Sequence, residues 1–237
     1  MPDWRSMVRM TETKKSAKKV LYIGGHGKVG LLAAPKLVDA GHDVTSLIRK
    51  EEQVTDIEKL GAKALVRDAT ELSVEDWAEI FTDFDVVVWG AGNGSRGGRD
   101  LTWAVDRDAT LKTIDAVEKL ASEGKNAPRY IEISYAGATK NDMPEEADPD
   151  FYPYVEAKKA VDKRLNETEL DYLILGPTTL TEESARGVEK LPDELPNEDQ
   201  RTSRELVAEI VTEVVSRDEV PASPLTFSDG DGSVADL

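Results

Sequence analysis

The chain of 237 residues contains no cysteine and only two histidines, His26 and His42. The absence of cysteine excludes disulfides, thiolate catalysis and cysteine-ligated zinc or iron–sulfur clusters. Two histidines are too few for a histidine-rich metal site, so we expect no metal. The sequence also lacks a run of about 18 uncharged apolar residues, and we therefore expect no segment that spans a bilayer.

Positive charge is also scarce, with 30 lysines and arginines against 47 acidic residues and a formal net charge of −17. A surface this negative repels phosphate backbones, so we expect no nucleic-acid partner. The acidic excess is strongest in residues 182–237, which hold 15 acidic and five basic residues. Residues 1–19 lack the apolar stretch of an export signal, which makes the cytoplasm the expected compartment.

Short apolar runs alternate with helical patterns along most of the chain. The expected strands are 20–23, 43–48, 64–66, 85–89, 129–134, 172–175 and 224–227, and the expected helices are 31–40, 51–60, 73–81, 103–122, 154–168 and 202–217. This alternation predicts an α/β fold in which helices cover both faces of a doubly wound parallel sheet, the Rossmann fold. We expect residues 1–18 to be mobile and residues 19–237 to form a single domain.

A glycine-rich turn follows the first expected strand and precedes the first expected helix. Gly24 permits a tight turn, Gly27 allows a pyrophosphate to approach the backbone, and Gly30 allows the helix to pack closely on the strand. The exposed N–H groups and the helix dipole then attract phosphates. The pattern predicts dinucleotide binding by Gly24, Gly25, His26, Gly27, Lys28, Val29 and Gly30.

The end of the second strand bears on which dinucleotide binds. NAD-binding proteins usually carry an acidic residue there for the ribose hydroxyls, whereas this chain has Arg49 and Lys50. A guanidinium suits a 2′-phosphate, and Lys28 offers a further positive charge. The pattern favours NADP, and NAD stays possible because Glu51 and Glu52 follow at once.

Two further strand ends belong to the expected cofactor site, because ligands of such sheets bind at the carboxyl ends of the strands. Asp68 and Ala69 follow the third strand, where the adenine edge would rest. Ala91 and Gly92 follow the fourth strand, over the nicotinamide-side ribose.

With these residues in place, the chain resembles the short-chain dehydrogenase/reductase superfamily, and most of all its compact NAD(P)-binding branch of NmrA-like proteins and biliverdin/flavin reductases. The resemblance is carried by residues 20–30, 43–49, 85–92, 102–117, 129–137, 151–165, 171–181 and 202–215. It implies a catalytic set in which Ser134 positions a carbonyl, Tyr154 exchanges a proton and Lys158 lowers the pKa of the tyrosine. The resemblance also gives Lys158 a role at the nicotinamide ribose, and it places Pro177 and Thr178 at the carboxamide.

The sequence departs from that pattern at several places. Gly176 and Pro177 stand where the family has Arg-Pro after the sixth strand, so an arginine-based role is lost. An acidic loop separates Ser134 from Tyr154, and Tyr135 is a rival phenol directly after the strand. Three functions stay open. The first is an NADPH-dependent reductase of a small carbonyl, quinone or flavin-like acceptor. The second is a non-catalytic NADP(H) sensor that acts through a protein partner, and the third is a nucleotide-sugar epimerase or reductase, for which the stretch after residue 175 is short.

Overall fold

The computed structural model describes residues 16–92 and 97–237. Residues 1–15 of the expected mobile segment, and 93–96 of the loop after the fourth strand, lie outside the described residues. The strands are β1 Lys19–Ile23, β2 Asp43–Ile48, β3 Lys63–Val66, β4 Val86–Trp89, β5 Arg129–Ile133, β6 Tyr172–Pro177, β7 Thr179–Thr181, β8 Val188–Leu191, β9 Arg201–Ser203 and β10 Leu225–Asp229. The main helices are α1 Lys28–Asp39, α2 Val54–Lys59, α3 Val74–Phe81, α4 Arg99–Thr102, α5 Thr110–Ser122, α6 Tyr152–Asn166 and α7 Arg204–Ser216.

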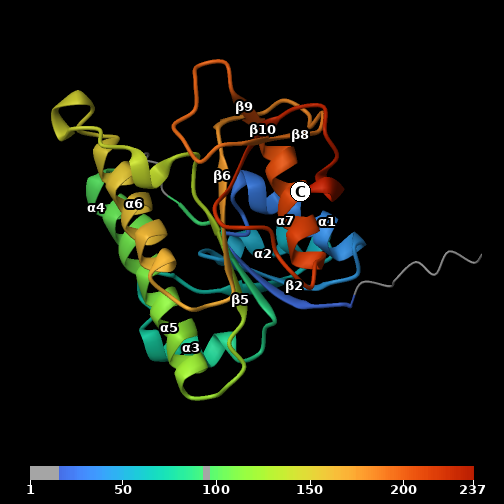
Figure 1. Cartoon of the computed structure of the whole chain (residues 1–237). Coiled ribbons are helices and arrows are strands. Elements are labelled where there is room, and N and C mark those ends of the chain that lie inside the picture. Colours follow the sequence, from blue (N-terminus) through green and yellow to red (C-terminus); the bar gives the residue numbers. More distant parts are fainter. Residues whose placement is uncertain (1–15, 93–96) are drawn as a thin grey trace, which may run out of the picture.

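In the described part of the chain, an eight-stranded sheet has the order β3-β2-β1-β4-β5-β6-β10-β8. All neighbouring pairs are parallel except β10 with β8. Figure 1 shows α3, α4, α5 and α6 on one side of this sheet and α1, α2 and α7 on the other. The predicted doubly wound α/β fold is confirmed.

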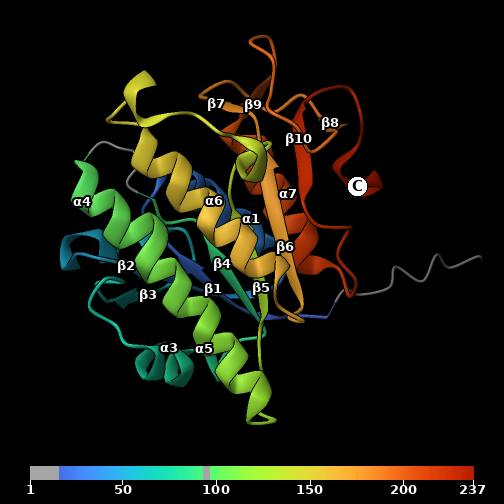
Figure 2. The ribbon, with the colours of Figure 1, turned by 60° about the vertical axis from the view of Figure 1, so that its left-hand side comes forward.

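The sheet separates two hydrophobic layers. Val20 and Tyr22 of β1 belong to the layer under α1 and α7, and Leu21 and Ile23 belong to the layer under α3 and α5. All four side chains are fully buried. Because successive side chains of a strand point to opposite faces, a strand covered on both faces is apolar throughout, as this one is. In Figure 2, α5 and α6 run side by side across their face of the sheet.

Most expected elements are present with small shifts at their ends. The helix that begins after Ser73 has the expected cap, because the Ser73 hydroxyl accepts a hydrogen bond from the Asp76 N–H at 3.1 Å. The first helix begins earlier than expected, at Lys28, directly inside the glycine turn. The long helix expected at 103–122 has a π-helical first part at 103–109, and α4 precedes it.

The sequence analysis missed three short strands after β6, namely β7, β8 and β9. It also placed Thr202 in the last helix, although Thr202 lies in β9, and Ser203 is the residue that caps α7. β7 pairs with β9 in a separate two-stranded sheet, and β8 extends the main sheet beside β10. Strands of three or four residues are too short to show a clear alternation in sequence.

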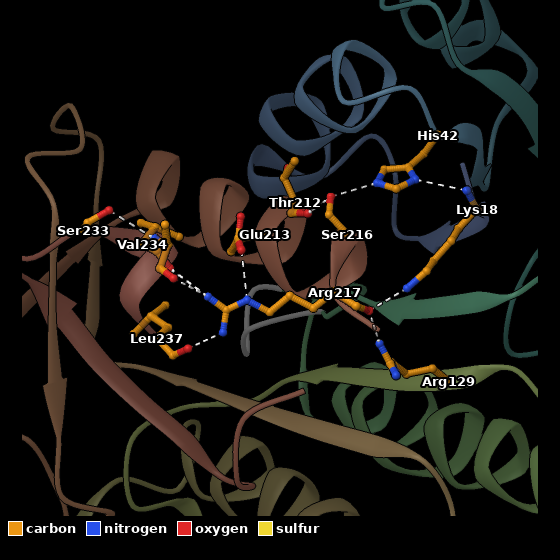
Figure 3. A network of polar contacts seen from close by, with 11 residues as sticks. Lys18, His42, Arg129, Thr212, Glu213, Ser216, Arg217, Ser233, Val234 and Leu237 are labelled. Carbon is orange, nitrogen blue, oxygen red and sulfur yellow. Dashed lines mark hydrogen bonds and ion pairs between the residues drawn. The ribbon is translucent and has the colours of Figure 1, made fainter. Parts of the chain in front are cut away.

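The amino ends of the strands and the C-terminus are joined by Arg217, which follows α7 (Figure 3). Its guanidinium donates to Glu213 Oε1 at 2.9 Å, to the Ala235 carbonyl at 2.8 Å and to the Leu237 carbonyl. One side chain thereby holds the last turn of the chain against α7.

The same network reaches the first strands of the sheet. The Arg217 carbonyl accepts from Lys18 Nζ at 2.6 Å and from Arg129 Nη1 at 2.8 Å. His42 Nδ1 accepts from the Lys18 N–H, so its other nitrogen, Nε2, carries the hydrogen and donates to the Ser216 hydroxyl at 2.9 Å. Lys18, His42 and Arg129 all lie at the amino ends of strands. The network therefore stabilises the end of the sheet that is opposite the glycine turn.

None of the helices in residues 16–92 and 97–237 has the length and apolar character needed to cross a membrane.

Candidate functional site

Two adjoining cavities lie along the carboxyl ends of the parallel strands. The first cavity, of about 310 Å³, follows the ends of β1, β2 and β3. The second, of about 440 Å³, lies between the glycine turn, the end of β5 and the start of α6. The two cavities share Gly27, Gly90, Ala91 and Gly92. The two cavities are therefore neighbours, with the glycine turn in the wall between them.

The glycine turn is shaped for close approach. Gly24 has φ +86°, and a Cβ there would lie 2.6 Å from the Ala91 Cα. A Cβ at Gly30 would lie 2.7 Å from the Gly25 carbonyl oxygen. Neither position has room for a side chain, as the glycine pattern predicted. α1 begins at Lys28 without a side-chain cap, so its first N–H groups suit the phosphates of a dinucleotide.

The residues within the turn differ in what they contact. His26 lines the first cavity, and its Nε2 lies 3.0 Å from Asp56 Oδ2. Lys28 and Val29 line the second cavity. The Lys28 ammonium is 2.5 Å from Glu182 Oε1. The structure thus places Lys28 on the opposite side of the turn from the end of β2, where the sequence analysis had assigned it to a 2′-phosphate.

Two arginines line the first cavity at the ends of neighbouring strands. Arg49 follows β2, and Arg67 follows β3. Ile48 and Val66 pair in the parallel ladder, and the Arg67 N–H donates to the Ile48 carbonyl at 2.9 Å, so the two arginines are neighbours. Both are exposed to solvent. The sequence analysis missed Arg67, although its position directly after an expected strand was a usable signal.

Lys50, also expected here, is absent from the lining formed by the described residues. Its ammonium pairs with Glu52 Oε1 at 3.2 Å. Four other residues expected near the cofactor also line the cavities. Asp68 and Ala69 line the first cavity, and Ala91 and Gly92 line both.

The Asp68 carboxylate is held by its own turn. It accepts from the Thr70 N–H at 2.9 Å and from the Thr70 hydroxyl at 2.7 Å, and these bonds lower its pKa. Asp68 therefore stays ionised. Its carboxylate is bonded to Thr70 and also lines the first cavity.

The structure brings Ser134, Tyr154 and Lys158 together in the wall of the second cavity. Ser134 directly follows β5, and the other two lie one turn apart on α6. The Lys158 ammonium donates to Glu132 Oε1 at 2.7 Å and to the Ile133 carbonyl at 2.8 Å. α6 is therefore anchored to β5 by an ion pair whose two side chains are 4% and 0% exposed.

A second buried carboxyl supports Ser134. Its hydroxyl oxygen lies 2.7 Å from Asp162 Oδ2 on α6. Burial raises the pKa of Asp162 to about 8, and the nearby charge of Glu132 adds to this effect. Burial likewise raises the pKa of Glu132 to about 7, against the opposing effect of Lys158. The sequence analysis did not identify Glu132 or Asp162, because a single acidic residue in an apolar strand or on a helix carries no pattern.

The Tyr154 ring packs against two other aromatic rings. Its centroid is 5.8 Å from that of Tyr135 and 5.3 Å from that of Phe151. Burial raises the pKa of Tyr154, and the Lys158 charge lowers it by less. Lys158 therefore lowers this pKa, as expected, but burial outweighs its effect and the net pKa is raised. The phenol is therefore protonated at neutral pH, as a proton donor has to be.

Tyr135, the rival phenol, accepts a hydrogen bond from Asn141 Nδ2 at 3.2 Å. Burial raises the pKa of Tyr135 well above the usual value of 10.0. Pro177 and Thr178 complete the lining on the β6 side. The Thr178 hydroxyl lies 2.8 Å from that of Thr202, which fixes this wall to β9.

A family model and a similar protein match this sequence. A family model described as NAD(P)H-binding matches residues 24–218. A Bacillus subtilis protein named as an uncharacterized sugar epimerase is 29% identical over 92% of this chain and 97% of its own.

Solved structures extend the comparison. A Bacillus halodurans protein provisionally assigned to the NAD-dependent epimerases/dehydratases is 28% identical, with a TM-score of 0.79 over 93% of this chain and 98% of its own. ChuY of Escherichia coli, an anaerobillin reductase, has the same fold, with 19% identity and a TM-score of 0.70 over 90% of this chain. Together with the glycine turn and the two cavities beside it, the match over residues 24–218 shows that the chain belongs to the NAD(P)H-binding family.

Proposed function

We propose that the chain is an NADPH-dependent reductase of a small conjugated acceptor, of the carbonyl, quinone or flavin class. The observation that carries the proposal is that the two cavities adjoin at Gly27, Gly90, Ala91 and Gly92, which line both. A dinucleotide that lies along the glycine turn extends from the arginines of the first cavity to the tyrosine of the second.

The charges of the first cavity favour NADPH over NADH. Arg49 and Arg67 stand side by side at its rim, where a 2′-phosphate gains charge-assisted hydrogen bonds. Asp68, which directly follows Arg67, already accepts two bonds from Thr70. It does not replace the acidic residue that NAD-binding proteins carry after the second strand.

A nicotinamide supplies a hydride when bound, and the chain then has to supply a proton and hold the acceptor. Tyr154 is the proposed proton donor, because its phenol is protonated at neutral pH and lines the second cavity. Lys158 stabilises the tyrosinate that this transfer leaves. Its own position is fixed by Glu132 and the Ile133 carbonyl.

Ser134 is the proposed group that positions the acceptor oxygen, and Asp162 decides where its hydrogen points. The Ser134 hydroxyl donates to Asp162 Oδ2 at 2.7 Å in the structure. Protonation of Asp162 reverses this bond, so that the carboxyl donates to the Ser134 oxygen and leaves the serine hydrogen for the cavity. An ionised Asp162 takes that hydrogen for itself. With the pKa of Asp162 at about 8, the productive arrangement holds at neutral pH and is lost in alkaline solution.

Tyr154→Phe tests the proposal. We expect turnover of NADPH with quinone, flavin and aldehyde acceptors to fall by about 10²–10⁴-fold, the usual contribution of a placed proton donor, while NADPH affinity is kept. Tyr172→Phe is the matched control, because that hydroxyl bonds Asn166 at 2.9 Å away from both cavities. Unchanged turnover in Tyr154→Phe would show that this ring only packs.

A non-catalytic NADP(H) sensor is the second candidate. It is favoured by the bonds that Lys158 and Ser134 already make to buried carboxyl groups, because both would then serve packing. Tight NADPH binding without turnover of any acceptor, together with capture of a protein partner that depends on the oxidation state of the cofactor, would support this reading over the reductase.

A further inference from the structure

An ion triplet stands beside the second cavity and takes no part in the chemistry proposed above. Lys28, at the start of α1, and Arg204, at the start of α7, both line this cavity. Lys28 Nζ lies 2.5 Å and Arg204 Nη1 3.0 Å from the same oxygen, Oε1 of Glu182. The two bases come from opposite ends of the sequence, and packing of α1 against α7 brings them together (Figure 1).

The two bases and the acid differ in how firmly they are placed. The Arg204 side chain is only 20% exposed, whereas the side chains of Lys28 and Glu182 are 60% and 66% exposed. Glu182 follows the short strand β7. The hydrogen bond from Lys28 lowers the pKa of Glu182, so the carboxylate is ionised. Exposed ion pairs contribute little net free energy because water and salt screen them. Glu182 is therefore an anionic partner, supplied by the chain itself, that the anionic group of a ligand can replace at a low cost in free energy.

The rest of the cavity wall is aromatic and apolar. Tyr135, Tyr154 and Phe151 pack ring against ring, and Leu180 and Pro196 also line the cavity. Flat apolar walls of this kind suit a planar ring system. The cavity wall thus combines a surface for a conjugated ring with Lys28 and Arg204, whose common partner Glu182 lies outside the lining formed by the described residues.

We infer that Lys28 and Arg204 form an anion subsite, and that the acceptor is a planar conjugated molecule bearing a carboxylate or phosphate group. This inference rests on the proposed reductase function. The anion displaces Glu182 and takes the charge-assisted bonds that Glu182 makes in the ligand-free chain. The subsite therefore selects among acceptors by charge, while the aromatic wall selects by shape.

FMN and riboflavin form a matched pair of probes, because they share the isoalloxazine ring and differ by one phosphate. With saturating NADPH, we expect the wild-type KM for FMN to be at least about tenfold below that for riboflavin, the usual effect of a charge-assisted bond. Arg204→Gln should raise the KM for FMN by about 10- to 100-fold and leave that for riboflavin within about twofold.

Glu182→Gln should act in the opposite direction. It removes the competing carboxylate, so the KM for FMN should fall and that for riboflavin should stay unchanged. Arg201→Gln is the control, because Arg201 bonds the Gln200 carbonyl and lies outside the lining of both cavities as the described residues form them.

Three results would overturn the inference. Equal KM values for FMN and riboflavin in the wild type would show that the cavity does not bind the phosphate group of FMN. An equal effect of Arg204→Gln on both flavins would assign Arg204 to packing. A loss of NADPH affinity in Arg204→Gln with an unchanged flavin ratio would assign the pair to the pyrophosphate of the cofactor.

Failure of the proposed reductase activity would be seen separately, as no NADPH oxidation with either flavin. Quenching of flavin fluorescence still measures the affinity ratio of FMN to riboflavin in that case. A ratio near one would overturn the anion subsite, and a ratio of about ten or more that depends on Arg204 would uphold it.

Discussion

Replacing Asp162 by asparagine should make the stability of the protein less sensitive to alkaline pH. Asp162 is 3% exposed, and burial raises its pKa from 3.8 to about 8. The folded chain therefore keeps a proton between these values that the unfolded chain releases. Since the folded state binds more protons, the free energy of unfolding falls as the pH rises through this window. The stabilising contribution is complete below about pH 4 and is lost above about pH 8.

The size of the effect follows from that pKa difference. Each pKa unit corresponds to about 1.4 kcal/mol, so the shift from 3.8 to about 8 sets a ceiling of about 6 kcal/mol. Relaxation and entry of water reduce such penalties in proteins. The free energy of unfolding of the wild type should therefore fall by about 2–4 kcal/mol more than that of Asp162→Asn when the pH is raised from 5 to 9. The asparagine keeps the shape of the side chain and offers the Ser134 hydroxyl an amide.

Urea unfolding of both proteins at several pH values measures the difference directly. Asp150→Asn, at an exposed position before α6, controls for the loss of one negative charge and should follow the wild type. Turnover is a second readout, because asparagine does not ionise and its bond to Ser134 therefore no longer changes with pH. The alkaline fall in wild-type turnover through about pH 8 should then be missing from the variant. Parallel stability curves from pH 5 to pH 9 would refute the assignment of a raised pKa to Asp162.

Two further predictions concern arginines. Arg49→Ala and Arg67→Ala should each weaken NADPH binding by about tenfold, the low end for an exposed charge-assisted bond, and leave NADH binding unchanged in fluorescence titrations; an equal loss for both cofactors would contradict a 2′-phosphate site. Arg217→Met should lower the free energy of unfolding by about 2–3 kcal/mol, because a 19% exposed guanidinium loses its bonds to Glu213 and to the C-terminal carbonyls. Arg201→Met, an exposed arginine bonded to the neighbouring carbonyl, should change stability in urea by less than about 0.5 kcal/mol. Similar losses in the two methionine variants would contradict the role of the C-terminal network.

The sequence by itself determined the elements whose signals are local. The apolar run at 20–23 and the glycines at 24, 27 and 30 defined the first strand, the turn and the start of the helix. Their roles depend on backbone conformation and on burial of neighbouring residues. The Ser73 cap was readable for the same reason, since its partner Asp76 is three residues away. Tyr154 and Lys158 were readable as a pair because they are one helical turn apart.

Only the tertiary structure decided which distant residues meet at the site. Arg67 joins Arg49 through the register of β2 with β3. Lys158 meets Glu132, 26 residues away, and Ser134 meets Asp162, 28 residues away, where α6 packs on β5.

The Lys28–Glu182 pair spans 154 residues and depends on how α1, α7 and β7 are placed. Such pairs leave no periodicity in the sequence, because crossover connections and packing set them, whereas strand and helix patterns report only on neighbouring residues. The sequence therefore located the glycine turn, and the packing of the chain decided which charges line the second cavity.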